Sequence, residues 1–131
     1  MANFRCERAF VMLDEPVPGL NHLRAVDAEG FAELLNEAMS FWMVEAGYTP
    51  LTDFLYAPFD RPKWRPAGKG LRSVRGAMEL HRKWREAGSN PLRYSQELLD
   101  RHLAVLGQVA DVLDLADSRD RRFYFAARDL A

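Results

Sequence analysis

Residues 98–127, LLDRHLAVLGQVADVLDLADSRDRRFYFAA, carry the pattern that decides the fold class of this chain. Apolar side chains recur every three to four positions from Leu99 to Ala116, which predicts a helix of about five turns. A polar break follows at residues 118–122, and the aromatic run FYFAA at 123–127 favours a closing strand. A long helix followed at once by a strand indicates a domain that mixes the two kinds of element.

Two further elements are expected in the N-terminal third of the chain. Residues 4–13 alternate weakly in hydrophobicity, which favours a strand. The side chains expected on one side of that strand are Phe4, Cys6, Phe10 and Met12. Residues 28–46 have helical spacing, and Asp27 before them and Gly47 after them are favoured cap residues. These signals predict one helix between the two caps.

Prolines and glycines divide the middle of the chain. Prolines bracket a short strand expected at residues 51–56, because proline is excluded from the interior of a ladder. Residues 57–70 hold three prolines and two glycines and are expected to form a long Pro/Gly/basic loop. A second helix is expected over residues 71–87, and Gly88 ends it.

The expected fold class is therefore α+β. One small domain, residues 1–131, holds about three helices on one face of a small sheet of two or three strands. We expect the N-terminal, middle and C-terminal strands to form that sheet. The chain has no internal repeat and no low-complexity tract that would separate two cores.

Composition excludes several classes of protein. A hydrophobic content of 48% with 28% charged residues is typical of a globular protein rather than a disordered one. No apolar run approaches the roughly 20 residues that a membrane span needs, and the N-terminus lacks an apolar signal-peptide core. The single cysteine, Cys6, cannot form an internal disulfide. We therefore expect a cytoplasmic protein without membrane contact.

Positive charge is concentrated in one part of the chain. Residues 60–86 hold nine Lys or Arg and three acidic residues, a net charge of +6. The rest of the chain carries −7, so the formal net charge is −1. Such polarity indicates either internal pairing of the two charges or a surface for a charged partner.

The basic part of the loop is the first candidate site. Aromatic and basic side chains alternate around Trp64, a combination that is typical of binding hot spots. The same combination suits single-stranded nucleic acid, through phosphate contacts and base stacking. In the alternative without a binding role, Trp64 fills the core while the cations face solvent. The candidate contact residues are Phe59, Arg61, Lys63, Trp64, Arg65 and Lys69.

The C-terminal end of the long helix is the second candidate site. Three aspartates crowd this end, where the helix dipole disfavours negative charge. A compensating basic segment, either residues 119–122 or the basic loop, or a partner's basic surface would explain them. Their spacing spreads them around the helix and no histidine joins them, so we expect no metal site. These candidate partner-binding residues are Asp111, Asp114 and Asp117.

The sequence offers little material for catalysis. His22, His81 and His102 lie in a loop and in two different helices. His81 falls on an apolar face, which indicates a hydrogen-bonded core histidine, whereas two acidic residues near His102 indicate an ordinary polar surface. Cys6, in a predicted strand, lacks the cationic setting of a reactive thiolate. We expect no enzyme, no catalytic residue and no cofactor.

The leading hypothesis is a small protein-interaction module of the immunity, antitoxin, inhibitor or adaptor type. It would dock on another protein through the charged and aromatic patches. One alternative is nucleic-acid binding through the basic segment 61–85. Another is a small-molecule site or an enzyme without a recognisable motif, with the proline-rich loop as a lid. Self-association through the apolar face of the long helix is a further possibility.

Overall fold

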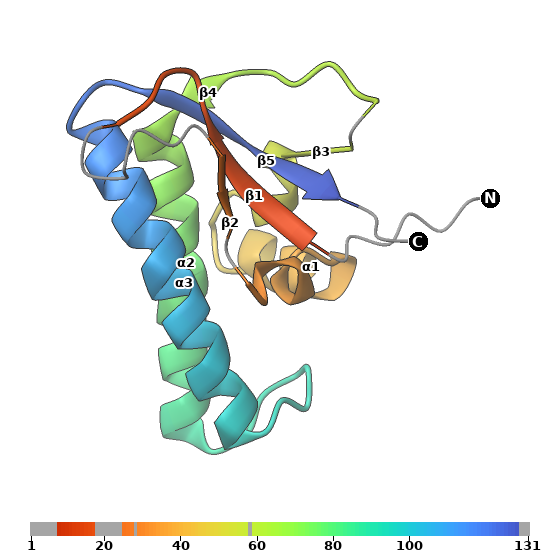
Figure 1. The fold of residues 1–131 in the computed structure, drawn as a ribbon. Coiled ribbons are helices and arrows are strands. Elements are labelled where there is room, and N and C mark those ends of the chain that lie inside the picture. Colours follow the sequence, from red (N-terminus) through yellow and green to blue (C-terminus); the bar gives the residue numbers. More distant parts are fainter. Residues whose placement is uncertain (1–7, 18–24, 28, 58, 129–131) are drawn as a thin grey trace.

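The computed structural model describes residues 8–17, 25–27, 29–57 and 59–128 (Figure 1). Three α-helices pack against a mixed sheet of short strands, so the predicted α+β fold is confirmed. The helices are α1 (Glu37–Glu45), α2 (Ala67–Ala87) and α3 (Gln96–Asp117), with the 3-10 helices η2 (Phe31–Leu34) and η3 (Leu51–Phe54). The strands are β1 (Arg8–Leu13), β2 (Ala25–Asp27), β3 (Leu55–Tyr56), β4 (Arg65–Pro66) and β5 (Arg122–Arg128).

Strand β5 is the centre of the sheet, whose order is β2-β1-β5-β3, with β4 also paired to β5. Strands β1 and β5 pair antiparallel from Arg8↔Arg128 to Leu13↔Phe123, so the expected pairing of the N-terminal and C-terminal strands is confirmed. Strand β3 runs parallel to β5, and β4 runs antiparallel to it. The sheet has more strands than predicted, because β2 and β4 have only three and two residues, too few for a period to be visible.

Alternation along β1 and β5 sends one set of side chains into the core. The buried strand residues are Ala9, Val11 and Leu13 on β1 and Phe123, Phe125 and Ala127 on β5. Phe10 and Met12 do share a side, as predicted, but theirs is the half-buried side away from the core. A period of two fixes which residues share a side and leaves open which side faces inward. Phe4 and Cys6 lie outside the described residues.

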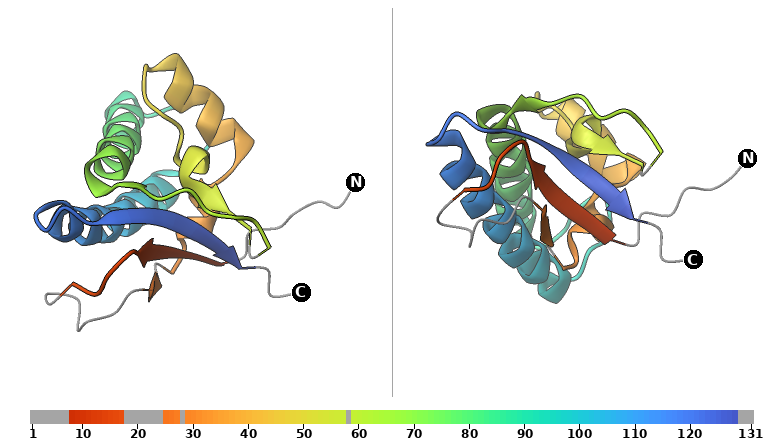
Figure 2. Two further views of the ribbon diagram at one scale, coloured as in Figure 1. Left: turned by 90° about the horizontal axis from the view of Figure 1, so that it is seen from above. Right: turned by 45° about the horizontal axis from the view of Figure 1, so that its top comes forward.

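The helices cover one face of the sheet. In the right-hand view of Figure 2, β1 and β5 cross in front of α2 and α1. Phenylalanine rings fill the space between the layers: Phe31 lies 4.9 Å from Phe125, and Phe54 lies 5.1 Å from Phe123, between ring centroids. No helix within the described ranges has both the length and the apolar character that crossing a membrane would require.

Helices α2 and α3 form a long hairpin whose far end, residues 88–95, projects beyond the sheet (Figure 1). Gly88, at φ 74°, ends α2 in the left-handed conformation that glycine favours. The Ser95 hydroxyl accepts a hydrogen bond from the Leu98 N–H (3.1 Å) and caps the start of α3. The end of α2 at Gly88 agrees with the sequence prediction.

Helix α2 begins at Ala67, earlier than the predicted start at residue 71. Pro66, at φ −56°, suits a helix start, and Gly70 serves close packing rather than a loop. A Cβ atom on Gly70 would lie 2.2 Å from the buried Phe123 ring. The loop expected at 57–70 is therefore shorter: it ends at Trp64, and Lys69 belongs to the first turn of α2.

The helix predicted over residues 28–46 is in fact two elements, η2 and α1. The Asn36 side chain accepts a hydrogen bond from the Met39 N–H (2.8 Å), so the N-cap lies inside the predicted helix. Asp27, the expected cap, belongs to β2 instead. The strand predicted at residues 51–56 is also wrong over most of its length, where η3 stands.

Candidate functional site

The segment after β3, residues 57–64, is held by a compact turn. The Asp60 carboxylate accepts a hydrogen bond from the Ala57 N–H (3.0 Å), and the Asp60 N–H donates to the Ala57 carbonyl (3.0 Å). The carboxylate is thus engaged with the backbone. Phe59 is 84% exposed, and Arg61 and Lys63 are exposed without an ion-pair partner among the described residues.

Trp64 lies on the face of the sheet that the helices leave open. The register of β4 with β5 (Arg65↔Phe123) places Trp64 beside Tyr124, and their ring centroids are 4.9 Å apart. The Tyr124 ring lies 5.9 Å from that of Tyr56 on β3. All three are half-buried, and Trp64 does not belong to the buried core. The interpretation that Trp64 fills the core is therefore wrong.

These side chains make up what we call the aromatic-basic surface. Its members are Tyr56, Phe59, Arg61, Lys63, Trp64 and Tyr124. The two tyrosines are new, since sequence reasoning did not select them. The sequence does contain a signal for Tyr124. It lies between Phe123 and Phe125, which face the core, and successive side chains of a strand point to opposite faces.

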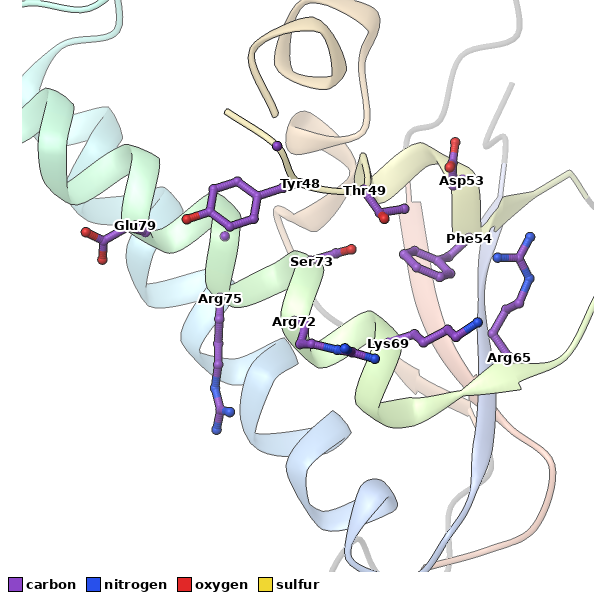
Figure 3. A pocket seen from close by; sticks show the side chains of 12 residues that line it. Tyr48, Thr49, Asp53, Phe54, Arg65, Lys69, Arg72, Ser73, Arg75 and Glu79 are labelled. Atoms are coloured by element: carbon purple, nitrogen blue, oxygen red, sulfur yellow. The ribbon is translucent and has the colours of Figure 1, made fainter. Parts of the chain in front are cut away.

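Arg65 and Lys69 leave this surface and line a cleft on the helical side (Figure 3). Trp64 directly precedes Arg65, the first residue of β4, and in an extended chain successive side chains point to opposite faces. The Arg65 guanidinium carbon lies 5.6 Å from the centroid of the Phe54 ring. The predicted basic loop is therefore divided between two surfaces.

The acidic end of α3 lies along α2 and away from the segment 57–64. Asp114 lies 3.9 Å from Arg75, and a Cβ atom on Gly68 would lie 2.9 Å from the Asp117 carboxylate. Asp111 lines a groove with Arg75 and Arg82. The hairpin thus brings the negative end of α3 to the positive N-terminal end of α2, which compensates the unfavourable placement of the aspartates.

The other basic residues near the end of α3 have different partners. Arg121 pairs with Glu15 (2.5 Å) and Arg122 pairs with Asp14 (3.5 Å), so they fasten the end of β1 rather than the aspartates. No group of three or more His, Cys, Asp or Glu side chains in the described part of the chain is placed to hold a metal ion.

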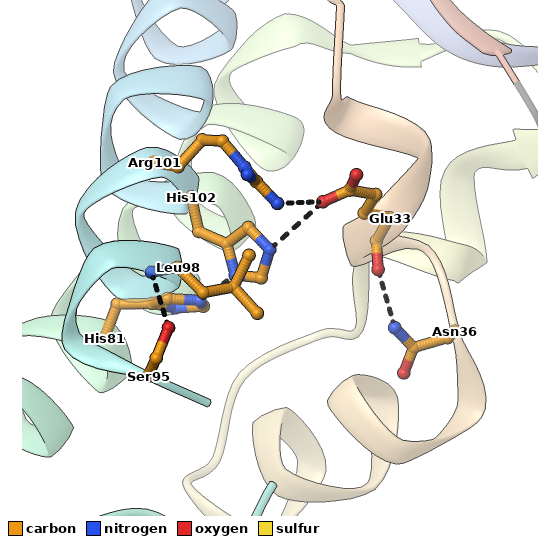
Figure 4. Close-up of polar contacts among 7 residues, drawn as sticks. All are labelled: Glu33, Asn36, His81, Ser95, Leu98, Arg101 and His102. Atoms are coloured by element: carbon orange, nitrogen blue, oxygen red, sulfur yellow. Dashed lines mark hydrogen bonds and ion pairs between the residues drawn. The ribbon is translucent and has the colours of Figure 1, made fainter. Parts of the chain in front are cut away.

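Two histidines meet inside the helical hairpin (Figure 4). His81 is fully buried, as predicted, and its Nδ1 lies 2.7 Å from the Ala77 carbonyl oxygen. His102 is only 2% exposed, so the expectation of a surface position is wrong. His81 Nε2 and His102 Nδ1 are 3.1 Å apart. His22 lies outside the described residues.

Geometry assigns the protons of this pair. A carbonyl oxygen only accepts, so His81 Nδ1 carries a proton and the Nε2 of the neutral ring accepts from His102 Nδ1. His102 Nε2 is then bare, with the Glu33 carboxylate 3.5 Å away and Arg101 at 3.5 Å from the same oxygen. No described residue donates a hydrogen bond to this nitrogen.

Burial sets the ionisation of both rings. It lowers the pKa of His81 to about 4, against the opposing hydrogen bond to the Ala77 carbonyl. Burial also lowers the pKa of His102, and the charge of Glu33 opposes that shift. The rings are therefore neutral at pH 7, and their hydrogen bond joins α2 to α3.

The chain was compared with protein-family models, with curated protein sequences and with solved structures, and no match was found in any of the three.

Proposed function

We propose that this protein is a small protein-interaction module, of the immunity, antitoxin, inhibitor or adaptor type. It docks on a partner protein through the aromatic-basic surface. The observation that supports this proposal is the placement of Trp64 against Tyr124, outside the core. The segment that leads to Trp64 also carries the highly exposed Phe59. Large aromatic rings beside unpaired cations are the side chains that supply most of the binding energy in protein interfaces.

The chemistry of the surface suggests the kind of partner that would fit it. Rings that are half-buried already lose little conformational entropy on binding, so an apolar patch on the partner would cover them. Arg61 and Lys63 have no acidic partner among the described residues, so acidic side chains around that patch would complement them. An interface of ordinary size, about 800 Å² per partner, is enough.

The test compares two pairs of matched variants. The chain is used to capture proteins from a nuclease-treated lysate of its own source, and each captured protein is then purified and its affinity measured. Phe59→Ala is compared with Phe41→Ala, an exposed phenylalanine (55%) on α1. Lys63→Glu is compared with Lys83→Glu, which lies on an exposed position of α2.

We expect Phe59→Ala to weaken binding by about 2 kcal/mol and Lys63→Glu to weaken it in a salt-dependent manner. The two control variants should bind like the wild type. Equal losses in the control variants, or full binding by the Phe59 and Lys63 variants, would overturn the proposal. Absence of any stoichiometric protein partner would overturn it as well.

Single-stranded nucleic acid is a second candidate partner. The succession of the Tyr56, Tyr124 and Trp64 rings, at 5.9 and 4.9 Å, supports it, because such rings can stack with bases while nearby cations meet phosphates. Titration of an oligonucleotide at several salt concentrations separates the two candidates. Nucleic-acid binding requires affinity that falls steeply with salt, and a weak or salt-independent response excludes it.

A further inference from the structure

A second site lies on the other side of the molecule, in the cleft between α2 and residues 47–54. The cleft has a volume of about 780 Å³, within the range of small-molecule sites. Its cationic wall is formed by Arg65, Lys69 and Arg72, and Tyr48, Thr49 and Ser73 add hydroxyl groups. None of the described residues of the segment 57–64 lines it, so this cleft is separate from the aromatic-basic surface.

Three of the cations in the cleft have no ion-pair partner among the described residues. Arg65, Lys69 and Arg72 form no ion pair with any described residue. Figure 3 shows the Lys69 and Arg72 side chains extending along the same side of the cleft toward Arg65. The buried Nε–H of Arg65 also has no acceptor among the described residues. Like charges held together without an anion repel each other, so an anionic ligand bound among these cations would be stabilised.

The acidic residues at the margins do not neutralise these cations. Figure 3 shows the Asp53 carboxylate directed away from Lys69 and Arg72, and Glu79 lies at the opposite end of the cleft. Asp114 is beside Arg75, whose side chain leaves the cleft toward α3. Asp117 meets the start of α2 at Gly68. The aspartates at the end of α3 therefore lie against the side of α2 that faces α3, away from the cations of the cleft.

We propose that this cleft binds the phosphate group of a small phosphorylated molecule. Two guanidinium groups and an ammonium group around one volume match a phosphate dianion, because guanidinium donates two parallel hydrogen bonds and ammonium supplies a point charge. A single carboxylate would leave part of this positive charge unmatched. The hydroxyl groups of Thr49 and Ser73 offer neutral hydrogen bonds to the rest of the molecule.

The test uses inorganic pyrophosphate as the probe, in calorimetric titrations at constant ionic strength. The variant Lys69→Ala/Arg72→Ala removes two cations from the cleft. The control Arg82→Ala/Arg85→Ala removes the same net charge from the same helix, outside the cleft, from residues that pair with Glu79 and Asp100. Titrations with inorganic phosphate, sulfate and a single-stranded oligonucleotide run in parallel, and far-UV circular dichroism checks that each variant is folded.

We expect saturable pyrophosphate binding by the wild type and the control, and at least a tenfold loss in the Lys69/Arg72 variant. Sulfate should bind more weakly than pyrophosphate, because it carries less charge. Equal losses in both double variants would mean general charge attraction and would overturn the proposal. So would a wild type that fails to bind pyrophosphate, or that binds only the oligonucleotide.

Discussion

The two sides of α2 both carry cations but differ in whether those cations have a carboxylate partner. On the side toward α3, Arg85 lies 2.6 Å from Asp100, and Arg75 lies 3.9 Å from Asp114. On the side toward the cleft, Lys69 and Arg72 have no carboxylate partner among the described residues. Carboxylates of α3 therefore pair with the cations on one side of α2, whereas the cations on the other side remain available to a ligand.

The largest expected effect is a loss of folding stability at low pH, caused by the two buried histidines of the hairpin. His81 has a pKa of about 4 in the folded state, below the ordinary value of 6.5, and the pKa of His102 is lowered as well. Below about pH 6.5 these histidines are protonated in the unfolded chain but stay neutral in the folded one. The free energy of unfolding therefore falls as the pH falls. The shift of His81 alone corresponds to a loss of up to about 3 kcal/mol between pH 7 and pH 4.

Urea unfolding at a series of pH values measures this loss. The variant His81→Gln cannot titrate, so its stability should decline less between pH 6.5 and pH 4 than that of the wild type. Glu33 and Arg101 face His102 in both proteins and act as a common background. If the variant and the wild type decline in parallel, the pH dependence does not come from the buried pair.

The packing at the start of α2 supplies the next effect. Gly70→Ala places a Cβ atom 2.2 Å from the Phe123 ring, so we expect a loss of about 1–3 kcal/mol from overpacking. Gly107→Ala on α3 is the matched control, because its Cβ would meet nothing within 4 Å and alanine favours a helix by about 0.5–1 kcal/mol over glycine. Thermal unfolding of both variants should give shifts of opposite sign, and a Gly70 variant as stable as the wild type contradicts the packing.

Sequence patterns predicted the two helices of the hairpin and the end of α2, because Gly88 acts locally through backbone conformation. They failed at residues 28–46, where two caps compete and Asn36, not Asp27, begins the α-helix. The short strand β4 was not predicted either, because it forms only through its pairing with β5, which is distant in the sequence. The sequence does not show that residues 64–66 lie beside β5, so it does not indicate that Trp64 and Arg65 point to opposite faces of the sheet.

The burial of His102 could not be predicted from its sequence neighbours. The acidic residues close to it in the chain lie on other sides of α3, and Asp100 pairs with Arg85 across the hairpin. The packing of α2, α3 and η2 places His102 in the interior, and such packing depends on contacts between residues far apart in the chain. Long-range packing also decides which cations of α2 pair with carboxylates, so the sequence could not predict that division either.

The stability cost of removing cations is the smallest expected effect, and it compares the two sides of α2 directly. Arg82→Ala/Arg85→Ala removes exposed ion pairs, so we expect a loss of about 0.5–1 kcal/mol. Lys69→Ala/Arg72→Ala removes cations without partners, so stability should stay within about 0.5 kcal/mol of the wild type or rise.

Denaturant unfolding of the wild type and of these two double variants, with and without pyrophosphate, tests directly whether the two sides of α2 differ. We expect the Arg82/Arg85 variant to be less stable but still stabilised by pyrophosphate. The Lys69/Arg72 variant should keep its stability and gain nothing from the ligand. If both variants lose stability alike and respond alike to pyrophosphate, the two sides of α2 do not differ, and the cleft does not bind phosphate as proposed.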